Sequence, residues 1–291
     1  MPGNNPVFGR ISKELEQGYA GFGKAPSGQA YGYAPPTPVN PQDTTTGGPV
    51  TAEALERAYT GSSAGPIDTG RLTLDDVVMK TLGLFVLLVA AGAVSWAACR
   101  GNLTLTQPLW MGGMVVGLAL GFAISFMKKV SVPLIVTYAV VEGVFLGAFS
   151  QYVDRLYPGL IATAVVATLC TFAGMFVGYQ SGLIKVTSRS RRIFAMMGLG
   201  YFLFSVVQVV LLMTGTIHGW GFGGSGMLGI GISVLGVGLA SYSLAVDFDT
   251  VDQAVAMGAP RHYSWLLAHG LIVSLVWLYI EIVRLLARLR D

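Results

Sequence analysis

Charged residues are scarce in this chain of 291 residues. Asp, Glu, Lys and Arg together make up 11% of it, whereas hydrophobic residues make up 53%. A soluble globular domain carries roughly a quarter of charged residues, so this chain has too few to cover a surface that faces water. The shortage excludes an ordinary soluble fold and predicts an integral membrane protein.

Cysteine is rare, and catalytic motifs and basic patches are missing. Cys99 and Cys170 lie in separate apolar segments without a neighbouring cysteine, so neither a disulfide framework nor a zinc site is expected. The net charge is +3, and the basic residues lie between apolar runs, so we expect no nucleic-acid partner. The glycine-rich "GWGFGGSG" at 219–226 lacks the lysine of a phosphate-binding loop. We therefore expect no enzyme and no cofactor other than a bound or permeant ion.

The first 70 residues differ in composition from the rest. Their stretch "GYAGFGKAPSGQAYGYAPPTPVNPQDTTTGGPV" is rich in Gly, Pro, Ser, Thr and Tyr. Such a segment buries too little apolar surface to offset the entropy lost on ordering. We predict a disordered arm over 1–70, with at most a short helix near 51–59, and a transmembrane domain over 71–291. The first residues contain no apolar run typical of a signal peptide, so we expect no cleaved one.

Seven long apolar runs follow the arm. Crossing the hydrocarbon layer takes about twenty apolar residues, and a lipid-exposed backbone must satisfy its own hydrogen bonds, so each run is expected to be a helix. Glycines at three- and four-residue spacings predict close helix packing. The expected spans are 77–99, 108–127, 131–151, 158–182, 193–215, 226–249 and 264–287.

Lysine and arginine in the connecting loops predict the orientation. With the N-terminus in the cytoplasm, eight basic residues face inward and five face outward. The inner set is Lys80, Lys128, Lys129, Lys185, Arg189, Arg191, Arg192 and Arg261, and the outer set is Arg100, Arg155, Arg284, Arg288 and Arg290. We therefore expect a multi-pass protein of the cell membrane, surrounded by lipid, with a cytoplasmic N-terminus. Seven complete spans place the last arginines outside, whereas a final segment that crosses only partly would keep them inside.

Acidic residues inside the spans are candidates for function, because a charge within the membrane is costly and usually faces a partner or a cavity. Glu142 lies in the middle of the third run, either as a structural hydrogen-bonded acid or on a conduction path. Asp247 and Asp249 close the sixth run. Residues two apart point in nearly opposite directions on a helix, so only one of them is expected to face the bundle interior. The alternative is a solvated helix end.

The last run carries a stripe of small and polar residues that suits a central helix. Its members are Gly270, Ser274, Glu281, Arg284 and Arg288. Glu281 and Arg284 are spaced i,i+3 and could simply pair, and His269 is either proton-sensitive or a packing residue. Two carboxylates that meet within the membrane would titrate as a coupled unit and offer oxygen ligands suited to Ca²⁺. Such a pair would form a pH-sensitive cation gate.

At these residues the chain resembles the Bax inhibitor-1 (transmembrane BAX inhibitor motif, YccA-like) family, especially its actinobacterial branch. The motifs that carry the resemblance are "DFDTVDQAVAMGAPRHYSW", "LVWLYIEIVRLLARLR" and, less specifically, "VEGVFLGAF". The resemblance implies seven helices with the seventh in the centre, and a pH-sensitive calcium leak controlled by one acid on helix 6 and one on helix 7. Those roles fall on Asp249 and Glu281, which would also be the Ca²⁺ ligands, and Glu142 matches a glutamate of helix 3.

The chain departs from the family pattern in its helix 7 acid, which is glutamate instead of aspartate. The separation between Asp249 and Glu281 is also long. With a turn at 258–264, Glu281 would lie about 12 Å deeper than Asp249, at 1.5 Å per helical residue. Spacing therefore places Asp249 opposite His269, whereas the motif match pairs it with Glu281.

Two functions follow from these residues. One is a pH-sensitive membrane cation (calcium) leak channel gated by the acidic pair. The other is an interaction protein that regulates a membrane protease or other membrane machinery, for which the arm over 1–70 would be the contact segment.

Overall fold

Seven long helices form the transmembrane domain. The computed structural model describes residues 70–127, 129–216 and 219–291, and no β-strand forms within these ranges. The elements are α3 (Leu74–Gly101), η1 (Leu103–Leu105), α4 (Thr106–Phe126), α5 (Val132–Leu156), α6 (Leu160–Gln180), α7 (Ser188–Met213), α8 (Met227–Ala256) and α9 (Tyr263–Arg290). All seven α-helices are long and apolar enough to span a membrane, which confirms the all-α membrane fold. The predicted arm, apart from Gly70, lies outside the described residues, as does its short helix at 51–59.

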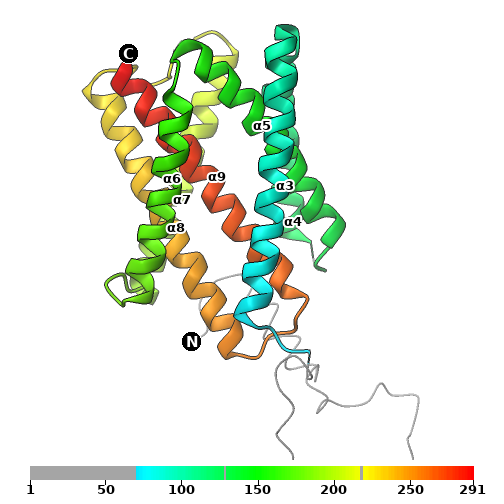
Figure 1. Ribbon diagram of the computed structural model, residues 1–291. Helices are drawn as coiled ribbons and strands as arrows, with labels where there is room; N and C mark the ends of the chain where they lie inside the picture. Colours follow the sequence, from blue (N-terminus) through cyan, green and yellow to red (C-terminus); the bar gives the residue numbers. More distant parts are fainter. Residues whose placement is uncertain (1–69, 128, 217–218) are drawn as a thin grey trace, which may run out of the picture. The chain divides into compact units, whose positions relative to one another are not determined.

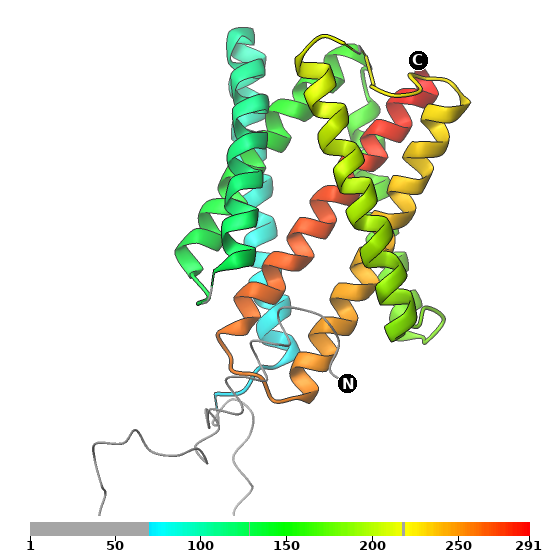
Figure 2. The ribbon, with the colours of Figure 1, turned by 180° about the vertical axis from the view of Figure 1, so that it is seen from behind.

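Helix α9 occupies the centre of the bundle. It passes obliquely between α3, α4 and α5 on one side and α6, α7 and α8 on the other, as Figure 1 and the reverse view in Figure 2 show. In the most apolar part of α9, 72% of the residues are buried, compared with 11% to 17% in α3, α4, α6 and α7. The expected central seventh helix is therefore confirmed, and the polar stripe of α9 lies inside the bundle.

The helices run alternately up and down, so the bundle has two distinct ends. The α8–α9 turn end holds the start of α3 and the turn at 257–262, and the C-terminal end holds Arg290 (Figure 1). The 28 residues of α9 make one unbroken helix, about 42 Å long and thus longer than the roughly 30 Å hydrocarbon layer. The final helix is therefore long and apolar enough to cross completely.

Local signals in the sequence define the helix ends. The side chain of Thr73 accepts a hydrogen bond from the backbone of Asp76 at the start of α3. Helix α8 ends at Ala256, followed by Gly258 with φ of 65°, a conformation that glycine adopts without strain. The prediction that this helix ends at residue 249 was wrong, because "TVDQAVA" contains no helix-breaking residue before that glycine.

The turn between α8 and α9 is fixed to the start of α3. Arg261 forms an ion pair with Asp76 at 2.8 Å, and the backbone N–H of Leu72 donates to the carbonyl of Ala259 at 2.7 Å. Lys80 contacts Ser264 and lies 5.4 Å from the ring centre of Trp265. These contacts hold the turn in place and thereby set how deep each residue of α8 lies relative to α9.

Glycines bring α3 and α5 into backbone contact. A Cβ atom at Gly143 would overlap the carbonyl oxygen of Leu88, and one at Gly147 would overlap that of Gly92. Small residues at such spacing allow helices in a membrane to approach closely. The expectation of glycine-mediated packing holds here, but Gly198 and Gly200 of "GLGYF" have open space where a side chain would lie.

Replacing Gly147 with alanine is expected to destabilise the bundle, because the added methyl group must push α3 and α5 apart. Overpacking of this kind costs about 1–3 kcal/mol. The matched control is Gly83→Ala on α3, where an added Cβ meets no atom within 4 Å and helix propensity favours alanine. Thermal unfolding in detergent should show a lower Tm for Gly147→Ala and an unchanged or higher Tm for Gly83→Ala. Equal Tm values for the two variants would contradict the close contact.

Candidate functional site

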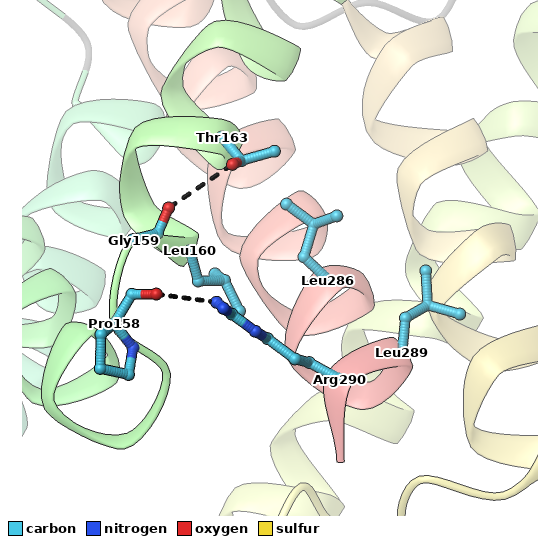
Figure 3. Close-up of a pocket in the computed structure, with 7 residues that line it drawn as sticks. All are labelled: Pro158, Gly159, Leu160, Thr163, Leu286, Leu289 and Arg290. Atoms are coloured by element: carbon cyan, nitrogen blue, oxygen red, sulfur yellow. Dashed lines mark hydrogen bonds between the residues drawn. The ribbon is translucent and has the colours of Figure 1, made fainter.

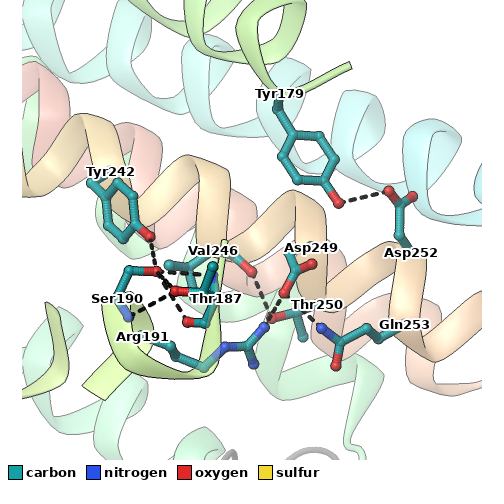
Figure 4. A network of polar contacts seen from close by, with 10 residues as sticks. All are labelled: Tyr179, Thr187, Ser190, Arg191, Tyr242, Val246, Asp249, Thr250, Asp252 and Gln253. Atoms are coloured by element: carbon teal, nitrogen blue, oxygen red, sulfur yellow. Dashed lines mark hydrogen bonds and ion pairs between the residues drawn. The ribbon is translucent and has the colours of Figure 1, made fainter. Parts of the chain in front are cut away.

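Two carboxylates and one guanidinium lie together in the half of the bundle near the α8–α9 turn end. Arg191, in the first turn of α7, forms an ion pair with Asp249 of α8. The two side chains are only 17% and 16% exposed. The Nε2 amide of Gln253 donates to the same carboxylate oxygen at 2.7 Å, as Figure 4 shows. Asp249 thus connects α8 to α7.

Asp247 connects α8 to the central helix instead. The hydroxyl of Ser274 on α9 donates to its Oδ2, and a Cβ at Gly270 would lie 3.7 Å from its Oδ1. Arg191 also interacts electrostatically with Asp247. Only one of the two aspartates faces the central helix, as helical geometry predicts. It is Asp247, whereas the motif match had assigned that role to Asp249.

Polar contacts from neighbouring helices support this cluster (Figure 4). Thr187 and Ser190 form a capping box that starts α7 one turn before Arg191. The hydroxyl of Tyr242 on α8 donates to Ser190 at 2.7 Å, and that of Tyr179 on α6 donates to Asp252 at 2.8 Å. Helices α6, α7 and α8 are therefore linked to one another at the same end of the bundle.

Glu281 belongs to a second polar group in the C-terminal half of the bundle. Its carboxylate accepts a hydrogen bond from the Tyr201 hydroxyl of α7 at 2.8 Å and pairs with Arg284 at 3.2 Å. The indole N–H of Trp277 donates to it at 3.3 Å. Glu281 is 2% exposed, so these partners compensate the burial of its charge. The structure contains the i,i+3 pair with Arg284 that the spacing suggested.

The structure does not bring Asp249 and Glu281 together. Asp249 lies seven residues before the end of α8, and Glu281 lies 18 residues after the start of α9, which separates them by about 16 Å along the bundle at 1.5 Å per residue. Their partners on α7, Arg191 and Tyr201, are ten residues apart, or about 15 Å. The two carboxylates are too far apart to share a proton or a calcium ion, because the long α8 and the short turn place them at different depths.

The family of the chain is established by comparison with known proteins. A family model described as Bax inhibitor 1 like matches residues 5–291. The chain belongs to this family. None of the curated proteins compared with the chain matches it. Membership in the Bax inhibitor 1 like family agrees with the seven spanning helices, and the protein is a multi-pass membrane protein.

Glu142 and His269 lie on the opposite side of α9 from Asp247. Glu142 of α5 is 8% exposed, and its carboxyl group packs where a side chain at Gly117 of α4 would lie. His269 packs edge-on against Tyr138 of α5, with ring centres 4.5 Å apart. His269 therefore faces α5, whereas the partners of Asp249 come from α7 and α8. The expectation that spacing places Asp249 opposite His269 is not supported by these contacts.

Sequence reasoning did not identify Arg191 or Tyr201 as site residues. Arg191 belongs to the basic run "SRSRR", which had been interpreted only as a topology signal, and nothing in the run distinguishes it from Arg189 or Arg192. Tyr201 is a polar side chain within a stretch, 193–246, that lacks charged residues. An aromatic hydroxyl in such a stretch is the one signal that could have pointed to it.

No metal centre is apparent among the described residues, since they hold no group of three or more His, Cys, Asp or Glu side chains placed to bind an ion. An open pocket of about 400 Å³ lies at the C-terminal end between α6 and α9, lined by residues 158–160, Thr163, Leu286, Leu289 and Arg290 (Figure 3). Thr163 and Arg290 both donate to backbone carbonyls there, at 3.5 and 2.9 Å. Both polar side chains that line the pocket are therefore already hydrogen-bonded to the backbone.

Proposed function

We propose that this protein is a pH-sensitive cation leak pathway of the cell membrane, with Ca²⁺ among the permeant ions. The observation that carries the proposal is the cluster of Asp247, Asp249 and Arg191 inside a seven-helix bundle. The cluster adjoins the central helix α9 through Ser274. Ionisable residues within a membrane domain are usually functional and face a partner or an aqueous cavity.

The charges of the cluster depend on proton uptake. The cluster contains two carboxylates and one guanidinium, which pairs with Asp249, so its net charge is −1 when both carboxylates are ionised and zero when one proton is bound. Excess negative charge and carboxylate oxygens attract a hard cation such as Ca²⁺. Asp252, the hydroxyl of Tyr179 and the amide of Gln253 lie beside the cluster. Asp247 and Asp249 are both partly exposed.

The same contacts hold the helices together in a closed arrangement. Arg191–Asp249 ties α7 to α8, and Asp247–Ser274 ties α8 to α9. The ion pair is partly buried, so its energetic contribution lies between two limits. An exposed pair contributes up to about 1 kcal/mol, whereas disruption of a buried pair costs about 3–5 kcal/mol. A change in protonation within the cluster therefore alters the free energy that separates the closed and open arrangements.

The cluster is proposed to face the cytoplasm. The α8–α9 turn end carries more basic residues, among them Lys80, Lys185, Arg189, Arg192 and Arg261, and such residues prefer the cytoplasmic side. The 30 residues of α8 extend about 45 Å, beyond the roughly 30 Å hydrocarbon layer. Asp249, seven residues before the end of α8, therefore lies near the inner boundary of that layer. We propose a conduit and no enzymatic activity.

Flux through the purified full chain tests this function. The protein reconstituted in liposomes should release trapped Ca²⁺ faster than protein-free liposomes, and the rate should change between pH 6 and pH 8. Parallel liposomes loaded with a neutral sugar of similar size report non-specific leakage. Calcium release no faster than in protein-free liposomes at every pH would remove the proposal.

A further inference from the structure

Arg288 is a buried arginine that donates only to backbone carbonyls within the described part of the chain. It is 1% exposed, and its guanidinium donates to the carbonyls of Gly229, of Trp220 at 2.7 Å and of Phe222 at 3.4 Å. A buried guanidinium requires such acceptors, because its charge is otherwise costly to remove from water. Arg288 therefore fixes the 219–226 loop and the first turn of α8 to the end of the central helix.

The 219–226 loop lies across the C-terminal end of the bundle. It leads into α8 beside the end of α9, as Figure 2 shows. Gly219, Gly221, Gly223 and Gly224 have φ between 50° and 85°, which only glycine adopts readily. Gly221 packs against Gln208 of α7. The indole N–H of Trp220 donates to Tyr157 at 3.1 Å. The conformation of the loop thus depends on its glycines and on its contacts with Gln208 and Tyr157.

Three buried polar atoms near this loop have no hydrogen-bond partner among residues 70–127, 129–216 and 219–291. They are Oε1 of Gln208, Oγ of Ser233 and Nε of Arg288, from α7, α8 and α9 respectively. The three residues are 4%, 0% and 1% exposed. An unsatisfied buried polar group costs about 1–3 kcal/mol, so these atoms require a partner that the described residues do not supply.

Shared contacts link the residues that carry these atoms. Gln208 and Arg288 donate to the same acceptor, the carbonyl of Trp220. Ser233 is one helical turn beyond Gly229, which accepts from Arg288, and one turn before Gly236, which packs against Glu281. A donor, an acceptor and a hydroxyl match the hydrogen bonds of a buried water molecule, which typically has two to four polar partners.

We propose that Gln208, Ser233 and Arg288 line a water-binding chamber between α7, α8 and α9, and that the 219–226 loop, held by Arg288, is its lid. The inference deepens the proposed function, on which its role in conduction rests: the chamber is the mouth of the path at the C-terminal face. The positive charge of Arg288 adds an electrostatic barrier to cations while the lid is closed.

Thiol labelling tests the chamber and its lid without measuring flux. The reporter is Ser233→Cys in the full chain with Cys99→Ser and Cys170→Ser, reconstituted in liposomes and treated with a membrane-impermeant thiol reagent. With Arg288 present, the reporter should react slowly. Arg288→Met keeps an apolar chain of similar length but removes the donors, and labelling should rise about tenfold or more. The matched control is Arg290→Met, two residues further on, where one hydrogen bond to Pro158 is lost and labelling should not change.

A second variant keeps the test decisive where Arg288→Met does not fold. Gly221→Val distorts the lid at a φ of 85° without altering α9, and labelling should rise in the same way. Unchanged labelling in the folded variants, or rapid labelling with Arg288 and Gly221 intact, would overturn the lid. Labelling that rises as expected in a protein without calcium flux would support the lid and reject the proposed function.

Discussion

Asp247→Asn is expected to remove most of the pH dependence of cation flux. The wild-type cluster can change its net charge by taking up a proton, whereas the amide cannot titrate and leaves Asp249 paired with Arg191. The rate of calcium release from liposomes should then vary less than about twofold between pH 6 and pH 8. Typical coupling free energies produce changes of about 5–150-fold. Stopped-flow fluorescence of a trapped indicator measures this release at each pH.

Two further variants identify the group that responds to pH. Asp252→Asn changes an acid of the same helix that is bonded to Tyr179, and Glu281→Gln changes the buried acid of the C-terminal half. Both should keep a wild-type pH profile, although Glu281→Gln should lower Tm because Arg284 loses its partner. A flat pH profile in Glu281→Gln together with a wild-type profile in Asp247→Asn would place the proton sensor in the C-terminal half and contradict the role of Asp247.

Ser274→Asp is expected to create the carboxylate pair that the family resemblance implied. The Ser274 hydroxyl already contacts the carboxylate of Asp247, so a second carboxylate there would repel it unless one of the two holds a proton. Two unit charges 4 Å apart interact by about 4 kcal/mol at an effective dielectric constant of 20. The variant should therefore lose stability as pH rises, and Ca²⁺, which favours carboxylate oxygens, should restore it.

Thermal unfolding between pH 6 and pH 8, with and without Ca²⁺, measures this effect. The matched control is Ser274→Asn, which has the same size and no charge, and its Tm should depend on pH as in the wild type. A Tm of Ser274→Asp that is independent of both pH and Ca²⁺ would show that residues 247 and 274 are not close enough to interact.

The sequence was sufficient to predict the fold. Scarcity of charge, seven apolar runs and small-residue spacing follow directly from the cost of placing polar groups in lipid, and all seven expected spans are helices in the structure. The stripe on α9 that includes Ser274 and Glu281 indicated a central helix, and α9 is central. Each of these predictions depends on local composition and periodicity, which the sequence displays directly.

The partners of the acids were harder to predict because they depend on helix length and rotation. The motif match paired Asp249 with Glu281, but α8 continues seven residues beyond Asp249, which moves the two acids to different depths. Asp247 and Asp249 are only two residues apart on α8, but they face different helices. Asp247 contacts α9 and Asp249 contacts α7. Arg191 could not be chosen from a run of similar basic residues without knowing where α7 begins.

The most direct test of the account is a charge reversal across the α7–α8 pair. Arg191→Asp and Asp249→Arg each place two like charges together, so each single variant should release Ca²⁺ about tenfold faster than wild type at pH 8, a change of about 1.4 kcal/mol. The double variant restores an opposite-charge pair with its direction reversed. We predict that it returns the release rate at pH 8 to near the wild-type value. A double variant that leaks as fast as either single variant would contradict the claim that this ion pair holds the bundle closed.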